Sequence, residues 1–176
     1  EFAKYWMHNA FLNIDNKKMS KSAGNFFTVR DIAEKYDLQV LRFFMLSAHY
    51  RSPLNFSADL MEAAKNGLTR ILTCAEKLSD LLKDKEEGTL TDAEKALLAE
   101  ASDYTKRFEE AMDDDINTAD AISVIFELVK FINTNLAAFQ ILFAKFPADS
   151  SFSGKYLKSF PGEVFWTSEN LKASVP

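Results

Sequence analysis

The sequence predicts a mainly α-helical fold, in which a short β-hairpin and two small helices precede an antiparallel helical bundle. Three segments carry apolar residues at alternating spacings of three and four, which places those side chains on one face of a helix. The segments lie within residues 57–82, 91–111 and 118–146. Because the joining segments are short, the three helices are expected to run antiparallel and to bury their apolar faces against one another.

The N-terminal stretch contains shorter elements. Residues 3–9 are expected to form a short helix, and the alternation of apolar and polar residues over 11–15 predicts a half-buried strand. Residues 16–25 are polar and basic and end in a Gly-Asn pair, which tolerates the backbone conformations of turns. Residues 26–28 are expected to return as the second strand of a hairpin around this loop.

Capping residues mark where the helices begin. An oxygen-bearing side chain just before a helix accepts hydrogen bonds from the free N–H groups of its first turn. The candidates are Thr28 with Asp31, Asp37, Ser57, Thr91 with Glu94, and Asn117 or Thr118. The acidic run Asp113–Asp115 is interpreted as the break between the second and third long helices. Its carboxylates are expected to complement the N-terminus of the third.

The chain divides into three predicted parts. Residues 1–57 hold the polar loop and the small helices, 58–147 form the bundle, and 148–176 form a tail without clear periodicity. A charged linker over 83–88 is expected to join the first two long helices. The third long helix has the most regular apolar stripe and is expected to run unbroken to Phe146–Pro147.

Composition excludes several classes of protein. One cysteine, Cys74, allows no internal disulfide, and with only two histidines a Cys/His zinc site is nearly excluded. Cys74 lies on an apolar helix face and is interpreted as a small buried hydrophobe. No apolar run approaches the roughly 20 residues that span a bilayer, and no signal peptide is recognised. We therefore expect a cytoplasmic protein that does not bind membranes.

Charge is distributed unevenly along the chain, which has a net charge of −5. Residues 1–57 contain eight Lys and Arg against five Asp and Glu, whereas residues 58–176 contain 13 against 21. The balance argues against a protein that coats nucleic acid in general. A basic head on an acidic body instead favours phosphate chemistry near the N-terminal end.

The loop at residues 18–22 has the residue types that phosphate chemistry needs. Lys18 and Lys21 place two ammonium groups three residues apart, beside the hydroxyl groups of Ser20 and Ser22. Lysine is a mobile point charge that suits phosphate oxygens, and hydroxyl groups and loop amides add directional donors. Such a loop can close over a triphosphate and stabilise the charge that develops when an α-phosphate is attacked. From composition alone, a solvated basic turn is the commoner alternative.

The order of residues in this loop is more specific than its composition. Lys-Met-Ser-Lys-Ser resembles the second signature of class I aminoacyl-tRNA synthetases. Further stretches in the same order resemble the cysteinyl-tRNA synthetase family, at residues 5–15, 25–31, 49–57 and 111–118. The resemblance extends over about residues 2–146.

This resemblance implies ATP-dependent ligation of cysteine to its tRNA through a cysteinyl-adenylate. It implies that Lys21 binds the ATP phosphates and stabilises the transition state, with Lys18 as the second lysine of the site. Ser20 and Ser22 would support the loop, and Met19 would pack near the adenosine. The implied partners are ATP with Mg²⁺, cysteine and tRNA(Cys), acting on a monomeric enzyme.

The resemblance also suggests where tRNA is contacted. The bundle is similar to the family's tRNA-binding helical domain of the DALR type, and the small helices before it are similar to a stem-contact module. Arg42, His49 and Arg51 are candidate contacts to the inner corner of tRNA, with ordinary surface charge as the alternative. Residues 148–176 do not resemble the family's usual helical extension, so no anticodon-reading residues are carried over.

Three alternatives stay open at this point. The mycothiol-pathway cysteine ligase of the same superfamily joins cysteine to an amino sugar and needs no tRNA. A different class I synthetase would share the loop at residues 18–22. A non-catalytic helical module would bind tRNA or a partner protein without performing chemistry.

The isolated chain is expected to be inactive, because the family's first signature, a His-Ile-Gly-His type stretch, does not occur in it. The zinc ligands of the family are expected only in a preceding N-terminal half. The chain starts at Glu1 without an initiator Met and is expected to begin inside a larger protein. The purified 176-residue chain should therefore give no ATP–pyrophosphate exchange with cysteine. Measurable exchange would contradict this expectation.

Overall fold

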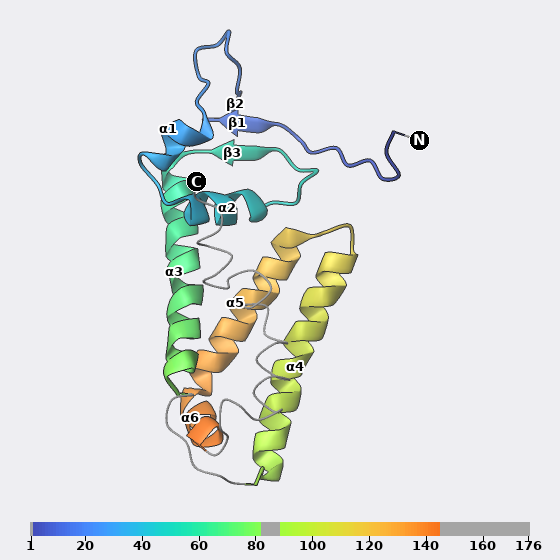
Figure 1. Cartoon of the computed structure of the whole chain (residues 1–176), viewed down its shortest axis with the longest axis vertical. Coiled ribbons are helices and arrows are strands. Elements are labelled where there is room, and N and C mark those ends of the chain that lie inside the picture. Colours follow the sequence, from blue (N-terminus) through green and yellow to red (C-terminus); the bar gives the residue numbers. More distant parts are fainter. Residues whose placement is uncertain (1, 82–88, 145–176) are drawn as a thin grey trace.

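The computed structural model describes residues 2–81 and 89–144. A small sheet lies at one end, α3 runs away from it, α4 and α5 pack alongside, and α6 lies at the far end (Figure 1). The elements are β1 (Leu12–Ile14), β2 (Lys17–Lys18), α1 (Val29–Ala33), α2 (Leu38–Leu46), β3 (Leu54–Phe56), α3 (Ala58–Leu81), α4 (Asp92–Asp113), α5 (Thr118–Thr134) and α6 (Leu136–Ala144). Because α4 runs opposite to α3 and α5, the predicted mainly α fold with an antiparallel bundle is confirmed.

The sheet has the strand order β2–β1–β3, with β1 antiparallel to β2 and parallel to β3. Asp15 and Asn16 form the hairpin turn, with φ angles of 47° and 62°. Two successive positive φ angles are typical of the type I′ turn, whose twist matches that of the flanking strands. The strand predicted over 11–15 is confirmed, but the returning strand is β2 rather than residues 26–28. The two-residue turn reverses the chain too early for the predicted pairing.

The parallel strand β3 is a feature that the sequence did not predict. It lies within the stretch 49–57 that was predicted to be a connector, directly after Pro53. Three residues are too few for an alternation of polar and apolar side chains to stand out. The connector is therefore shorter than expected, and its end belongs to the sheet.

The helix predicted over residues 3–9 is wrong. This stretch has no regular secondary structure. Its large apolar side chains, Tyr5, Trp6 and Met7, are exposed. A short helix is marginal in water unless it packs an apolar face, and exposed side chains provide no such packing.

The predicted helix caps are confirmed. Thr28 and Thr91 each form a capping box, and Asp37 and Asn117 accept N–H groups of the first turn. Ser57 Oγ accepts the Leu60 N–H at 3.3 Å. Each such cap stabilises its helix by about 1 kcal/mol. In the first box, hydrogen bonds from Thr28 lower the pKa of the Asp31 carboxyl.

One apolar cluster joins the sheet end to the bundle. Its buried members come from α2 and the first half of α3: Val40, Phe43, Phe44, Met61, Ala64 and Leu68. Phe126 of α5 packs against it. At Gly67, a β-carbon would lie 3.2 Å from Phe126 Cζ and 3.3 Å from Phe43 Cε1. The glycine therefore lets two aromatic rings from different helices approach the backbone of α3.

A second cluster fills the far half of the bundle. It joins the second half of α3 to the three helices that follow, through Cys74, Leu78, Leu98, Ala101, Leu128, Val129, Phe131, Ile132, Phe139, Leu142 and Phe143. Cys74 is buried as predicted, and burial raises the pKa of its thiol. The apolar spacing within residues 57–82 also predicts buried positions at Leu60 and Ala75, but both are exposed, and their neighbours Met61 and Cys74 are buried instead.

The third long helix is broken, contrary to the prediction of an unbroken helix to Phe146–Pro147. Asn135 separates α5 from α6, and the two axes are bent by 75°. At the end of α5, the Phe131 carbonyl accepts both the backbone N–H and the side-chain amide of Asn135, each at 3.0 Å. The predicted end at Phe146–Pro147, the linker 83–88 and the tail 148–176 lie outside the described residues.

Among residues 2–81 and 89–144, the structure contains no single helix that is long and apolar enough to cross a membrane. Only α5 and α6 together reach that length and composition, as a pair bent by 75°.

The fold of the far end can be tested at Phe139, whose side chain is fully buried between Phe131 and Phe143. Phe139→Ala should lower the free energy of unfolding by about 3–5 kcal/mol, because it removes a large buried ring and leaves a cavity. Ile141→Ala is the matched control, since Ile141 lies in the same helix with 60% of its surface exposed. Its effect should stay within about 0.5 kcal/mol. Urea denaturation measures the free energy of unfolding of both variants. An equal decrease in the two would contradict this packing of Phe139.

Candidate functional site

The loop predicted to carry the chemistry lies between β2 and α1 and projects away from the helices (Figure 1). Met19 and Ser20 are half-buried at its base, whereas Lys21 and Ser22 are exposed. The Met19 N–H donates to the Leu12 carbonyl at 3.3 Å, which extends the ladder of the hairpin into the base of the loop. The structure thus brings all five residues of the predicted motif together on one exposed turn.

Asn25 closes this turn. Its side-chain carbonyl accepts the Ser20 N–H at 3.0 Å, and its side-chain N–H donates to the Lys18 carbonyl at 3.2 Å. The side-chain amide of Asn25 therefore links the backbone of Lys18 to that of Ser20. The sequence indicated Asn25 only as a turn residue. A short polar side chain three positions after Ser22, next to the glycine of the turn, was the available signal for this clamp.

The serines and glycine shape the tip of the loop. Ser20 Oγ accepts the Ala23 N–H at 3.2 Å and lies 3.3 Å from Ser22 Oγ. The Gly24 N–H donates to the Lys21 carbonyl at 3.2 Å, and Gly24 has a φ of 68°. This left-handed conformation favours glycine. These contacts hold the two serines within the loop, and their supporting role in ATP binding stays a prediction.

The two lysines are not neutralised by acidic side chains. In the described ranges, the ion pairs include neither Lys18 nor Lys21. Lys18 Nζ lies 4.2 Å from the centroid of the Phe11 ring, and Lys21 Nζ lies 5.3 Å from that of Phe26. Cation–π contacts at exposed sites are worth only about 0.5–1 kcal/mol. Both ammonium groups can therefore exchange a ring for an anionic ligand at low cost.

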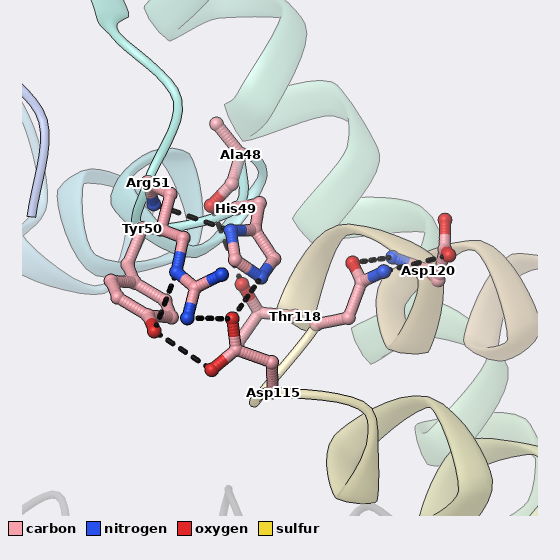
Figure 2. A network of polar contacts seen from close by, with 8 residues as sticks. Ala48, His49, Tyr50, Arg51, Asp115, Thr118 and Asp120 are labelled. Atoms are coloured by element: carbon pink, nitrogen blue, oxygen red, sulfur yellow. Dashed lines mark hydrogen bonds and ion pairs between the residues drawn. The ribbon is translucent and has the colours of Figure 1, made fainter. Parts of the chain in front are cut away.

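A second polar site lies at the connector between α2 and β3. Figure 2 shows His49, Tyr50 and Arg51 gathered around the carboxylate of Asp115. The Tyr50 hydroxyl donates to Asp115 Oδ1 at 2.8 Å, and Arg51 Nη2 lies 3.0 Å from Asp115 Oδ2. His49 Nε2 lies farther away, 3.6 Å from the same oxygen. Two of the three predicted tRNA contacts thus share one acidic partner from the turn between α4 and α5.

This arrangement corrects the interpretation of the acidic run. Asp115 does not serve the N-terminus of α5, because its carboxylate faces the connector and Asn117 is the cap. Asp115 and Ile116 both have a φ of 56°, which is uncommon for a β-branched residue such as Ile116. This partnership could not be predicted from the sequence, because Tyr50 and Asp115 lie 65 positions apart.

The third predicted tRNA contact, Arg42, lies elsewhere. It belongs to α2, its side chain is exposed, and it takes no part in the network around Asp115. Metal ligands do not converge either. Within residues 2–81 and 89–144, no three His, Cys, Asp or Glu side chains could hold an ion together.

The clamp in the loop can be tested by amide hydrogen exchange. Asn25→Ala removes the acceptor of the Ser20 N–H, so this amide should exchange about fivefold faster, which corresponds to about 1 kcal/mol for one hydrogen bond. Asn25→Asp keeps the acceptor and should keep most of the protection. Ser22→Ala is the control, since it removes a hydroxyl contact from the same loop and spares this bond. Unchanged exchange in Asn25→Ala would refute the clamp.

Two stretches of the chain match known protein families. Residues 1–66 match the family described as tRNA synthetases class I (C) catalytic domain. Residues 107–149 match the family described as DALR domain. The first match contains the loop and the connector, and the second contains Asp115 and α5.

Curated relatives carry one common name, Cysteine--tRNA ligase. The protein from Lachnospira eligens is 67% identical over 134 residues, covering 76% of this chain and 28% of the relative. The Clostridioides difficile protein is 57% identical over 135 residues, covering 77% and 29%. The protein from Lachnoclostridium phytofermentans is 62% identical over 139 residues, covering 76% and 30%. The chain therefore spans less than a third of the length of these relatives.

A solved structure supports the fold. The ternary LeuRS–tRNA–LeuAMS complex from Agrobacterium radiobacter matches with a TM-score of 0.63 at 14% identity, over 78% of this chain and 19% of that one. The family matches fall on both the sheet end and the bundle, and the relatives match at 57–67% identity. The chain belongs to the cysteinyl-tRNA synthetase family of class I and matches the C-terminal portion of its members.

Proposed function

We propose that this chain supplies the signature loop and the tRNA-contacting helices of an enzyme that ligates cysteine to tRNA(Cys) with ATP. The observation that carries the proposal is the clamped loop at residues 18–22, which presents two ammonium groups that no acidic side chain in the described ranges neutralises. Such a loop suits a polyanionic ligand such as a triphosphate. The names of the relatives supply the amino acid and the acceptor.

In the first step, the carboxylate of cysteine attacks the α-phosphorus of ATP. A new oxygen–phosphorus bond forms, the bond to the β-phosphate oxygen breaks, and pyrophosphate leaves with the electron pair. Negative charge grows on the phosphate oxygens, and Lys21 Nζ at the exposed tip is suited to stabilise it. Lys18 at the base would support the same charge, and Met19 would pack against adenosine.

In the second step, a hydroxyl of the 3′-terminal ribose of tRNA attacks the carbonyl carbon of cysteinyl-adenylate. An ester bond forms and AMP leaves. The part of this chain in that step is to hold the tRNA. The proposed contacts are the exposed Arg51 with His49 beside it, and the exposed Arg42 on α2. The bundle would provide the surface behind them.

The remaining partners are also part of the proposal. ATP would enter with Mg²⁺, and the enzyme would act as a monomer in the cytoplasm. The residues of this chain do not fit the zinc ion of the family, because within residues 2–81 and 89–144 no three His, Cys, Asp or Glu side chains lie close enough to hold it. No step is therefore assigned to zinc here.

Among the alternatives, ligation of cysteine to an amino sugar is disfavoured by two observations. The three relatives share the name Cysteine--tRNA ligase, and the chain carries a match to the DALR domain. A helical bundle beyond the active-site loop serves a large acceptor better than a small sugar. We therefore favour tRNA as the acceptor.

The proposal can be tested in a chimera that joins the N-terminal part of the Lachnospira eligens relative to this chain. The chimera should charge tRNA(Cys) with cysteine. Lys21→Ala should lower kcat by about 100- to 1,000-fold, as expected for the loss of a group that stabilises the transition state. Lys17→Ala is the matched control, an exposed lysine of β2 just outside the motif, and should change kcat little.

Two results would refute the proposal. One is a folded chimera that does not charge tRNA(Cys), and the other is an equal loss of kcat in the two lysine variants. Pyrophosphate exchange without transfer to tRNA would instead favour a different acceptor for cysteine.

A further inference from the structure

We propose that Asp115 is a positioning residue, which orients Arg51 for contact with a phosphate of bound RNA. This inference rests on the proposed function, because it assumes that the connector faces tRNA. It adds a role for an acidic residue that cannot itself bind a phosphate. The evidence is the geometry of the contacts among Asp115, Tyr50 and Arg51.

The guanidinium of Arg51 is held at two of its nitrogens. Nη2 lies 3.0 Å from Asp115 Oδ2, and Nε donates to the Tyr50 hydroxyl at 3.1 Å. That hydroxyl in turn donates to Asp115 Oδ1 at 2.8 Å, so one carboxylate closes a ring of three side chains. An arginine in solution would sample many rotamers, whereas this one is confined to a single orientation.

Arg51 is accessible to solvent even though its guanidinium is held by Asp115 and Tyr50. Its side chain is 66% exposed, although it makes both contacts. The N–H groups that these contacts do not use remain free to donate to an anion. Arginine binds phosphate best through a pair of parallel N–H groups, which requires the plane of the guanidinium to be set in advance.

His49 fits the same arrangement. Its Nδ1 accepts the Arg51 backbone N–H at 3.2 Å, so the ring proton of the neutral form lies on Nε2. Nε2 faces Asp115 Oδ2 at 3.6 Å, and the ring stacks on Tyr50 with 4.7 Å between centroids. Contacts of both the backbone and the side chains thus hold the connector in place.

The turn that carries Asp115 is built for this contact. Asp115 and Ile116 occupy the left-handed region, each with a φ of 56°. Such conformations persist only where surrounding contacts hold them. The Thr118 hydroxyl adds a second link to the connector, since it donates to the Ala48 carbonyl at 3.4 Å (Figure 2).

Electrostatics makes the role of Asp115 testable, because charge and orientation predict opposite effects. If only charge mattered, removing a carboxylate beside Arg51 would strengthen binding to a polyanion. If orientation matters more, the same change weakens binding although the protein becomes more positive. The sign of the change in affinity therefore separates the two roles.

The experiment measures binding of the full 176-residue chain to a tRNA(Cys) transcript by filter binding over a range of salt concentrations. Asp115→Asn is the main variant, since asparagine tolerates the left-handed conformation and leaves the backbone in place. It should raise the Kd by about threefold or more. Asp114→Asn, which removes the same charge one residue away, is the control and should leave the Kd unchanged or lower it.

Arg51→Ala identifies the group through which Asp115 acts. It should raise the Kd. It should also reduce the slope of log Kd against log salt by about 1, the amount expected for the loss of one phosphate contact. The double variant Arg51→Ala/Asp115→Asn should bind no more weakly than Arg51→Ala alone, since Asp115 then has nothing to orient. Tyr50→Phe keeps the ring and loses the bridging hydroxyl, so it should also raise the Kd.

Circular dichroism and thermal unfolding establish which variants fold, and Tyr50→Phe replaces Asp115→Asn if the latter does not. Equal or tighter binding by a folded Asp115→Asn variant, with normal binding by the parent chain, would overturn the positioning role and leave the proposed function intact. Additive losses in the double variant would overturn it as well. Absence of salt-dependent tRNA binding by the parent chain would overturn the positioning role, whereas the proposed function is decided separately by charging of tRNA(Cys) in the chimera.

Discussion

The packing of α3 against the other helices is the interaction on which the rest of the structure depends. The first half of α3 buries Met61, Ala64 and Leu68 against α2 and the sheet end, and the second half buries Cys74 and Leu78 in the bundle. One rigid helix therefore belongs to both apolar clusters. Aromatic rings of α2 and α5 meet at Gly67, where the absence of a side chain allows the close approach. The loop and the connector are held in place relative to the bundle by this shared helix.

Much of the fold could be predicted from the sequence because its signals are local. Caps such as Thr91 with Glu94 act over one helical turn, and the apolar spacing of α3, α4 and α5 repeats often enough to be recognised. The failures have physical causes. The helix predicted over residues 3–9 lacked a surface to pack against, and β3 was too short to show a pattern. The break at Asn135 leaves no trace in the apolar stripe, because buried residues such as Ile132 and Phe139 lie on both sides of it.

In the candidate site, too, some features could be predicted from local sequence and others could not. The five residues of the loop could be recognised because their order is contiguous. Asn25 could be placed in the turn, but its two hydrogen bonds depend on the three-dimensional closure of the loop. The partnership of Asp115 with Tyr50 and Arg51 joins segments that only the packing of α3 and α5 brings together. From sequence, Asp115 was interpreted through its nearest neighbours, as an acid beside a helix start.

The parallel pairing of β1 with β3 has a consequence for how the chain acquires its structure. The hairpin of β1 and β2 is local, but two short strands alone are only marginally stable in water. The third strand and the bond from the Asn16 N–H to Asn55 Oδ1, at 2.7 Å, tie the hairpin to residues about 40 positions later. During synthesis, the base of the loop therefore cannot be completed until α1, α2 and β3 have left the ribosome. The loop at residues 18–22 is therefore synthesised before β3, and its base becomes ordered only once β3 is in place.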